Sequence, residues 1–354
     1  MYRSHRNRLD DQRFGRKPGI CAWSLFFIPK SDYSGKNLID CEGALVMSVT
    51  TTDYLSRDYL PTREFRAGAR HLQRLPEGAE EQPYTLFALK PLGPIIGAEI
   101  EGVDLGQPVG PELKAELHRA FLEWKVLFFR NQTIDSSQQL AFAKLWGELE
   151  KHPFLPRGSA EEVTRFEKGA DMTGNENVWH TDVTWRLDPA LGSVLRLSEV
   201  PPHGGDTLWA DMGAAYDNLP EDVKRRIDGL TAIHDFTPSF GRRMTPDILA
   251  AKQEEFPAAE HPVVRTHPET GRKTLFVNAA FTVRIVGLEP EESERLLNYL
   301  FRQAQTPEYQ VRFHWEANSV AFWDNRATQH YAASDYFPHR RVAERISIAG
   351  DRPY

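Results

Sequence analysis

The sequence has few cysteines, no long apolar run and no excess of positive charge. Its two cysteines, Cys21 and Cys41, lie near the N-terminus, so they cannot form a disulfide framework for the rest of the chain. This usage fits a reducing, cytoplasmic setting. No run of 18 apolar residues occurs, and we therefore expect no membrane-spanning helix. The 43 Lys and Arg residues are outnumbered by 50 Asp and Glu residues, so the net charge of −7 gives no general attraction to nucleic acid.

Glycine motifs that bind phosphate are also missing. No G-x-G-x-x-G follows a strand-like segment and no P-loop is present, so nucleotide-binding folds have no support. With 354 residues the chain can bury a large core without a disulfide or a structural metal. Periodic patterns begin only near residue 84. We predict a poorly ordered N-terminal extension over residues 1–82 and one domain over residues 83–354.

Short strands dominate the predicted domain. A helix is expected over 111–124, a buried strand over 126–129, and many short strands from residue 179 onward, with helical insertions near 212–229 and 289–305. This pattern favours a mainly β fold with flanking helices, a sandwich or a jelly roll. Residues 153–178 show little periodicity, and a loop of that length is typically a functional lid, although a surface insertion is the alternative.

A possible metal site begins with His180-Thr181-Asp182. On a strand, residues i and i+2 share a face, so an imidazole and a carboxylate would lie side by side. These are two members of the 2-His-1-carboxylate set that binds non-haem Fe(II). The pair alone is a weak signal, because chance gives roughly 0.7 such pairs in this composition. His330, far along the chain, is the candidate for the third ligand.

Two arginines follow His330 in a β-rich run. Arg341 and Arg345 are four residues apart, so on a strand they would share a face about 13 Å apart. An arginine stays charged, so burying one without an anion is unfavourable. Two inward arginines beside a metal would imply one anion on a cosubstrate and one on a substrate. The alternative is two surface arginines in salt bridges.

Several ordered motifs make the sequence resemble the taurine dioxygenase family of Fe(II)/2-oxoglutarate oxygenases over roughly residues 84–354. Together they are far more specific than the His-x-Asp pair. The motifs are Trp179-His180-Thr181-Asp182-Val183-Thr184, Gly204-Gly205-Asp206-Thr207-Leu208-Trp209, His261-Pro262-Val263-Val264-Arg265, Leu275-Phe276-Val277-Asn278, Trp323-Asp324-Asn325-Arg326-Ala327-Thr328-Gln329-His330 and the final Gly350-Asp351.

The resemblance implies a double-stranded β-helix, the cupin-like jelly roll, with His180, Asp182 and His330 as ligands and catalytic residues on Fe(II). It implies that Arg341 pairs with the distal carboxylate of 2-oxoglutarate, with help from Thr207; a guanidinium and a hydroxyl suit that group. The cosubstrates would be 2-oxoglutarate and O2, and the products succinate and CO2. Iron-dependent halogenases of this superfamily lack the carboxylate ligand, so the presence of Asp182 predicts hydroxylation.

The resemblance also implies a set of substrate contacts. Arg345 matches the family's anchor for a sulfonate or sulfate group. His152 and the backbone N–H of Val183 match further contacts to that anion. Phe240 and Phe281 match apolar walls of the pocket, although core packing is the alternative for either residue alone.

Two positions depart from the taurine enzymes. Leu155 stands where those enzymes carry a tyrosine near the substrate amine, and Glu176 stands near the position of an asparagine. Leu155 favours an apolar tail, whereas a carboxylate at Glu176 could still pair with an ammonium. Taurine, longer alkyl sulfonates and sulfate esters therefore all stay open.

The predicted reaction is hydroxylation of the carbon that bears the sulfonate of a small anionic substrate, which then releases sulfite and an aldehyde. One alternative is an alkyl sulfate ester, which would release sulfate. Another is a sulfur-free carboxylate bound by Arg345, and a third is a non-enzymatic jelly-roll module that binds a metal or an anion. The resemblance also leads us to expect a homo-oligomer, a dimer or tetramer.

Overall fold

The structure is a computed structural model, and it describes residues 68–354. Most of the predicted N-terminal extension, residues 1–67, lies outside the described residues. Residues 68–82 have no regular structure but contact the domain: the backbone N–H of His71 donates to Oδ1 of Asn218 (2.9 Å), and Arg74 pairs with Glu123 (2.9 Å). No helix within residues 68–354 is long and apolar enough to cross a membrane.

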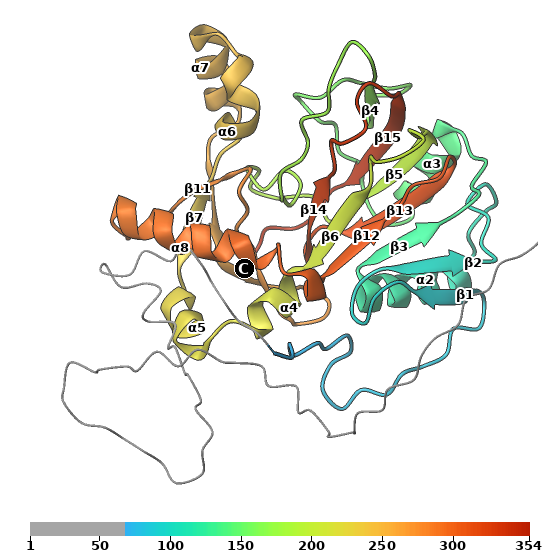
Figure 1. Cartoon of the computed structure of the whole chain (residues 1–354), viewed down its shortest axis with the longest axis horizontal. Coiled ribbons are helices and arrows are strands. Elements are labelled where there is room, and N and C mark those ends of the chain that lie inside the picture. The colour runs from blue at the N-terminus through green and yellow to red at the C-terminus, as the bar shows by residue number, and fades with distance from the viewer. Residues whose placement is uncertain (1–67) are drawn as a thin grey trace, which may run out of the picture. The chain divides into compact units, whose positions relative to one another are not determined.

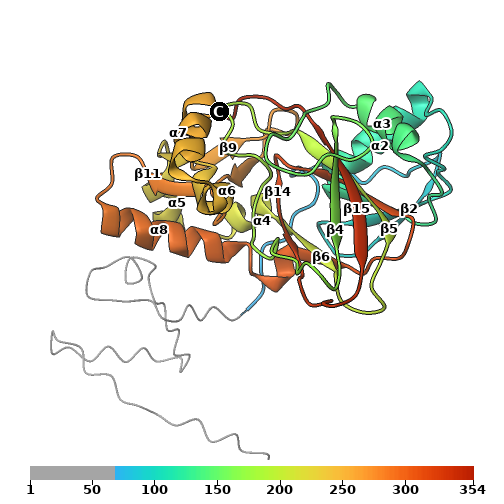
Figure 2. The ribbon, with the colours of Figure 1, turned by 90° about the horizontal axis from the view of Figure 1, so that it is seen from above.

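The strands are short and the helices are few, as the sequence predicts (Figures 1 and 2). The strands are β1 (Ala88–Pro91), β2 (Ala98–Glu101), β3 (Val126–Phe129), β4 (Val163–Lys168), β5 (Gly192–Glu199), β6 (Thr207–Asp211), β7 (Thr231–His234), β8 (Ala259–Pro262), β9 (Val264–Thr266), β10 (Lys273–Leu275), β11 (Thr282–Ile285), β12 (Gln310–Phe313), β13 (Ser319–Asp324), β14 (Thr328–Ala332) and β15 (Arg341–Ile348). The helices are α2 (Pro111–Trp124), α3 (Ser136–Lys144), α4 (Met212–Asp217), α5 (Glu221–Ile227), α6 (Thr237–Phe240), α7 (Pro246–Glu255) and α8 (Pro290–Gln303), with 3-10 turns η1 (Gly241–Arg243) and η2 (Pro307–Tyr309).

Two sheets enclose the core. The larger has the order β1-β2-β3-β13-β5-β15-β4 and is antiparallel except between β2 and β3. The smaller has the order β12-β6-β14, and its side chains pack against the larger sheet, as where Phe313 stacks on Phe128 at 3.9 Å between ring centroids. This confirms the mainly β jelly roll with flanking helices. The β11-β7-β8 sheet and the β9–β10 hairpin extend it.

Strand alternation divides the apolar residues between two layers. In β3, Val126 and Phe128 join the core between the sheets, whereas Leu127 and Phe129 face the layer under α2 and α3. All four are buried, which explains why β3 reads as a continuous apolar run. A capping box at Asp135 and Gln138 starts α3, and that helix packs against β5 and β15.

The structure corrects several expected boundaries. Residues 153–178 are not structureless, because they include β4, an edge strand whose polar side chains hid its alternation. Residues 179–186, expected as a strand, form turns with one isolated bridge. The helix expected over 212–229 is two helices, because Pro220 begins the second. Helix α7 was not predicted, because none of its side chains is fully buried and no apolar periodicity marks it.

Close packing of the two central strands gives the first prediction. A Cβ at Gly192, in β5, would overlap the carbonyl oxygen of Trp323 in β13. We expect Gly192→Ala to lower the free energy of unfolding by about 1–3 kcal/mol, because the backbones must separate. Gly110→Ala is the control, since its Cβ meets nothing within 4 Å. Urea denaturation measures both, and equal effects would contradict the packing argument.

Candidate active site

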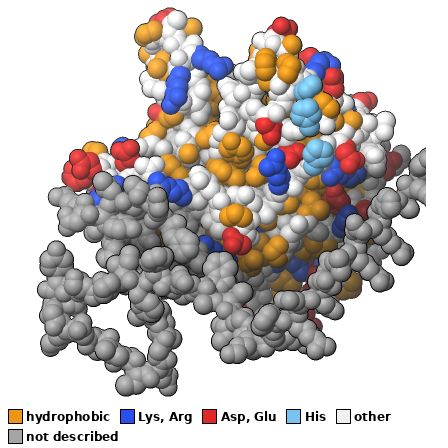
Figure 3. All heavy atoms as spheres, in the orientation of Figure 1, with side chains coloured by type: hydrophobic (Ala, Val, Ile, Leu, Met, Phe, Trp, Pro, Cys, Tyr) orange, Lys and Arg blue, Asp and Glu red, His pale blue; other side chains and the backbone are white. Residues whose placement is uncertain are grey.

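All the predicted site residues line one cavity of about 1100 Å³. It lies between a lobe that carries α6 and α7 and another that carries β4 and β15, where Figure 3 shows the surface hollowed. The predicted residues in its walls are His152, Leu155, Glu176, His180, Asp182, Val183, Thr207, Phe240, Phe281, His330, Arg341 and Arg345. A cavity of this size suits a small substrate together with a cosubstrate.

Backbone hydrogen bonds set His180 and His330 opposite each other. The N–H of His180 donates to the carbonyl of His330 (3.0 Å), and the N–H of His330 donates to the carbonyl of His180 (2.8 Å). Directly opposed residues of an antiparallel pair put their side chains on one face, so the ring centroids lie only 4.1 Å apart. This short bridge joins segments that are 150 residues apart.

Asp182 completes the cluster from a turn rather than from a strand. Its Oδ1 lies 3.6 Å from Nε2 of His180 and 3.9 Å from Nε2 of His330. The next residue, Val183, has φ of 49°, a left-handed conformation that is strained for a β-branched side chain. Within residues 68–354, no hydrogen bond uses the Val183 N–H. Val183 also lines the cavity.

The three side chains fit a metal ion. One potential ligand atom from each lies within 4.8 Å of the others. Nδ1 of His180 is 2.8 Å from the carbonyl of Val178, so that nitrogen carries the proton and Nε2 keeps its lone pair for a metal. Burial would raise the pKa of Asp182, but Arg345 and the two histidines lower it below its usual range, so the carboxylate is ionised. Two imidazoles and one carboxylate are the donor set preferred by non-haem Fe(II).

Arg341 is a buried cation without a counter-ion. Only 8% of its surface is exposed, and no hydrogen bond or ion pair of its guanidinium is formed within residues 68–354. Burial lowers the pKa of Arg341, and Tyr336 and nearby acidic side chains only partly oppose that shift. Such a site is poised to bind an anion.

Thr207, on β6, lines the same cavity with its hydroxyl already oriented. Its Oγ1 accepts a hydrogen bond from Nε1 of Trp315 (2.9 Å), so its proton is available to a ligand. The hydroxyl and the unpaired guanidinium of Arg341 together match the pairing expected for a carboxylate.

Arg345 lies on the same inward face of β15, as expected, but it has a partner. Its Nη1 donates to Oδ1 and Oδ2 of Asp182 at 2.8 and 3.0 Å, while its Nε is buried and unpartnered. His152 lines the cavity too, and its Nδ1 accepts the N–H groups of Phe154 and Leu155 (both 3.2 Å). Burial and Arg345 lower the pKa of His152 to about 3, so the ring is neutral and carries its proton on Nε2.

Apolar side chains form part of the cavity wall. Leu155 lines it together with Met172 and Met244, and Phe240 and Phe281 stack at 6.1 Å between centroids. These aromatic rings therefore serve as walls as well as core packing.

Glu176 lines the cavity, but its carboxylate already has a partner. Its Oε1 pairs with Nζ of Lys168 at 2.9 Å, a residue of β4 that the sequence did not single out. Lys168 lies opposite Arg341 in the β4–β15 pair, so the position of β4, a strand that was not predicted, places Lys168 in the cavity wall. The carboxylate is thus already neutralised, which leaves little to attract a substrate ammonium.

The fold and these side chains define a class, the jelly-roll oxygenases with two histidines and one carboxylate for iron. Comparison of sequences identifies the family within that class. The chain belongs to the family described as Taurine catabolism dioxygenase TauD, TfdA family, which matches residues 88–347. It is therefore a 2-oxoglutarate-dependent dioxygenase that uses Fe(II) and O2.

Named relatives cover most of this chain. An alkylsulfatase from Acinetobacter baylyi is 38% identical over 279 residues, 77% of this chain and 87% of the relative. An alpha-ketoglutarate-dependent sulfate ester dioxygenase from Pseudomonas putida is 39% identical over 274 residues, 74% of this chain and 89% of the relative. A crystal structure of a taurine dioxygenase from Burkholderia xenovorans has a TM-score of 0.66 and 40% identity, and covers 76% of this chain and 91% of that one.

Two neighbouring arginines allow a controlled test of the cosubstrate site. We expect Arg341→Met to raise the KM for 2-oxoglutarate by at least about 100-fold, because a buried charge-assisted pair contributes roughly 3 kcal/mol. Arg340→Met is the control: it removes the adjacent guanidinium, which forms exposed ion pairs with Glu167 and Glu199. Succinate formation measures both, and an unchanged KM in Arg341→Met would place the carboxylate elsewhere.

Proposed function

We propose that this chain hydroxylates the sulfur-bearing or sulfate-bearing carbon of a small organosulfur anion with an apolar tail. In this proposal, His180, Asp182 and His330 hold Fe(II), while Arg341 and Thr207 hold the distal carboxylate of 2-oxoglutarate. The observation that carries it is the unpaired, buried Arg341 in the same cavity as the three metal-binding side chains.

The substrate anion would occupy the other end of the cavity. We assign it to Arg345, to Nε2–H of His152 and to the free N–H of Val183. These donors come from three segments around Asp182, so an anion bound there would lie beside the iron ligands. Arg345 has an unpartnered Nε for it, and the neutral His152 ring supplies a donor rather than a charge. Phe240 and Phe281 would exclude water from the adjacent carbon.

The reaction follows from this placement. When bound, the iron with 2-oxoglutarate supplies the activation of O2 and the oxidising equivalents, and the cosubstrate leaves as succinate and CO2. The protein's own contribution is to hold the anion so that the neighbouring C–H faces the three ligands. One oxygen atom of O2 is added to that carbon as a hydroxyl group. A hydroxylated sulfonate then loses sulfite and becomes an aldehyde, whereas a hydroxylated sulfate ester loses sulfate.

Two observations favour an apolar tail over the amine of taurine. Leu155, Met172 and Met244 contribute apolar surface to the cavity, and the carboxylate of Glu176 is already paired with Lys168. The relatives named as an alkylsulfatase and a sulfate ester dioxygenase support a sulfate ester as the second candidate, and the solved taurine dioxygenase supports a sulfonate. A homo-oligomer, a dimer or tetramer, also stays a proposal, and light scattering of the purified chain would test it.

A substrate panel separates these candidates. The Fe(II)-loaded protein is given taurine, a linear alkyl sulfonate, an alkyl sulfate ester and a sulfur-free carboxylate, and succinate, sulfite and sulfate are measured together. We expect one sulfite or sulfate per succinate for a substrate with an apolar tail. Succinate coupled only to the carboxylate would overturn the organosulfur proposal, although it would leave the dioxygenase class intact.

Leu155 offers a direct test of tail selection. We expect Leu155→Tyr to lower kcat/KM for a long alkyl chain about tenfold and to change that for taurine much less, because apolar contact with the tail is lost. Leu187→Tyr is the matched control, since Leu187 is 49% exposed and is absent from the cavity walls. Equal effects on long and short substrates would show that Leu155 does not contact the tail.

A further inference from the structure

Asn325 clasps the peptide groups around the proposed iron carboxylate. Its Oδ1 accepts the backbone N–H of Asp182 (2.8 Å), and its Nδ2 donates to the carbonyls of Asp182 (3.1 Å) and Ala190 (3.0 Å). The side chain is only 1% exposed, so water does not compete for these bonds. One amide thus fixes the residue on both its N–H and its carbonyl side. A turn with a strained residue at Val183 needs such support.

The turn that carries Asn325 also reaches the other proposed ligands. The carbonyl of Thr328 accepts the hydroxyl of Thr181 (2.9 Å), and β14, which begins at Thr328, carries His330 two residues later. Residues 324–328 therefore contact the segment of His180 and Asp182 and also start the strand of His330. A shift of this one turn would change the distances among all three ligands.

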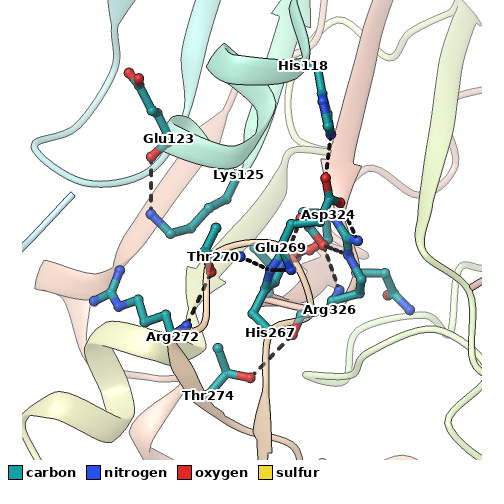
Figure 4. A network of polar contacts seen from close by, with 12 residues as sticks. His118, Glu123, Lys125, His267, Glu269, Thr270, Arg272, Thr274, Asp324 and Arg326 are labelled. Atoms are coloured by element: carbon teal, nitrogen blue, oxygen red, sulfur yellow. Dashed lines mark hydrogen bonds and ion pairs between the residues drawn. The ribbon is translucent and has the colours of Figure 1, made fainter. Parts of the chain in front are cut away.

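A buried charged cluster holds the turn in place (Figure 4). The carboxylate of Asp324 accepts the backbone N–H of Arg326 (2.9 Å), Nε and Nη2 of its guanidinium (2.9 and 2.8 Å), and Nε2 of His267 (3.0 Å). Beyond it, Nη1 of Arg326 pairs with Glu269 (2.6 Å), which pairs with Nε2 of His118 (2.8 Å). The sticks in Figure 4 show these groups converging on the Asp324–Arg326 turn.

The charged groups of this cluster have defined hydrogen-bond partners. Burial would raise the pKa of Asp324, but Arg326 and His267 lower it below its usual range, so the carboxylate is ionised. Nδ1 of His267 accepts the N–H groups of Glu269 and Thr270, which leaves Nε2 as the donor to Asp324. A buried ion pair adds little net stability over an apolar replacement, but its fixed directions can specify one geometry.

We propose that Asn325 is a positioning residue for Asp182, held in register by the Asp324–Arg326–His267 cluster, and that it sets the orientation of the carboxylate relative to His180 and His330. This inference rests on the proposed function for the metal role of those residues. It assigns to Asn325 no contact with substrate or cosubstrate.

The chain offers a matched control for a test. Gln132 is also a buried amide that clasps backbone: its Oε1 accepts the N–H of Leu105 (2.7 Å), and its Nε2 donates to the carbonyls of Val103 (3.0 Å) and Arg130 (2.9 Å). It makes the same three kinds of bond as Asn325, but none of its three partners is a proposed metal ligand. A general loss of stability should therefore affect both variants alike.

The experiment compares Asn325→Ala with Gln132→Ala. Thermal unfolding reports stability, titration calorimetry with Co(II) reports metal affinity, and the ratio of product to succinate reports coupling. We expect similar falls in Tm, but a 10–100-fold weaker Co(II) affinity and a lower coupling ratio only in Asn325→Ala, because residues that orient metal ligands have effects of this size.

The outcomes separate this inference from the proposed function. Co(II) binding that is unchanged in Asn325→Ala, or weakened equally in Gln132→Ala, overturns the positioning role while the proposed metal site stands. If the wild-type protein binds Co(II) no more tightly than His330→Ala does, that result counts against both the positioning role and the proposed metal site. If Asn325→Ala does not fold, Asn325→Ser replaces it, and wild-type Co(II) affinity in that variant also overturns the inference.

Discussion

The site depends on two backbone hydrogen bonds between His180 and His330. They form an isolated bridge outside the named strand pairs, yet they bring together segments 150 residues apart and turn both imidazoles to one face. Asp182 then follows His180 around a turn rather than along a strand. The carboxylate reaches the imidazoles because Asn325 and Thr328 hold that turn on both sides. The β13–β14 connection thus contacts the segment of His180 and Asp182 and leads into the strand that carries His330.

The buried arginines and their counter-ions indicate where the cavity can bind an anion. An arginine does not lose its charge at any ordinary pH, so an inward arginine needs a counter-ion from the protein or from a ligand. Arg326 has its counter-ion in Asp324, and its role is structural. Arg341 has none within residues 68–354, which leaves the counter-ion to a ligand. Arg345 is intermediate, since it contacts Asp182 through one nitrogen and keeps Nε unpartnered.

Much of this organisation could be predicted from the sequence, and the failures have physical causes. The spacing of Arg341 and Arg345 predicted a shared inward face, and both side chains line the cavity, because strand periodicity is a local property. His180 and Asp182 do lie together, but not because they share a strand face, since Asp182 lies in a turn. The sequence does not reveal that turn, because a valine is not expected to adopt the positive φ of Val183. β4 and its Lys168 were missed because an edge strand carries polar side chains. The Asn325 clasp depends on contacts 143 residues apart, which no local pattern reveals.

The most direct measurement is anomalous diffraction from crystals grown without oxygen in the presence of Fe(II) and 2-oxoglutarate. The account predicts one iron peak bonded to Nε2 of His180, to the Asp182 carboxylate and to Nε2 of His330, with the distal carboxylate of 2-oxoglutarate on Arg341. Iron bound elsewhere, or a cosubstrate carboxylate away from Arg341, would contradict it.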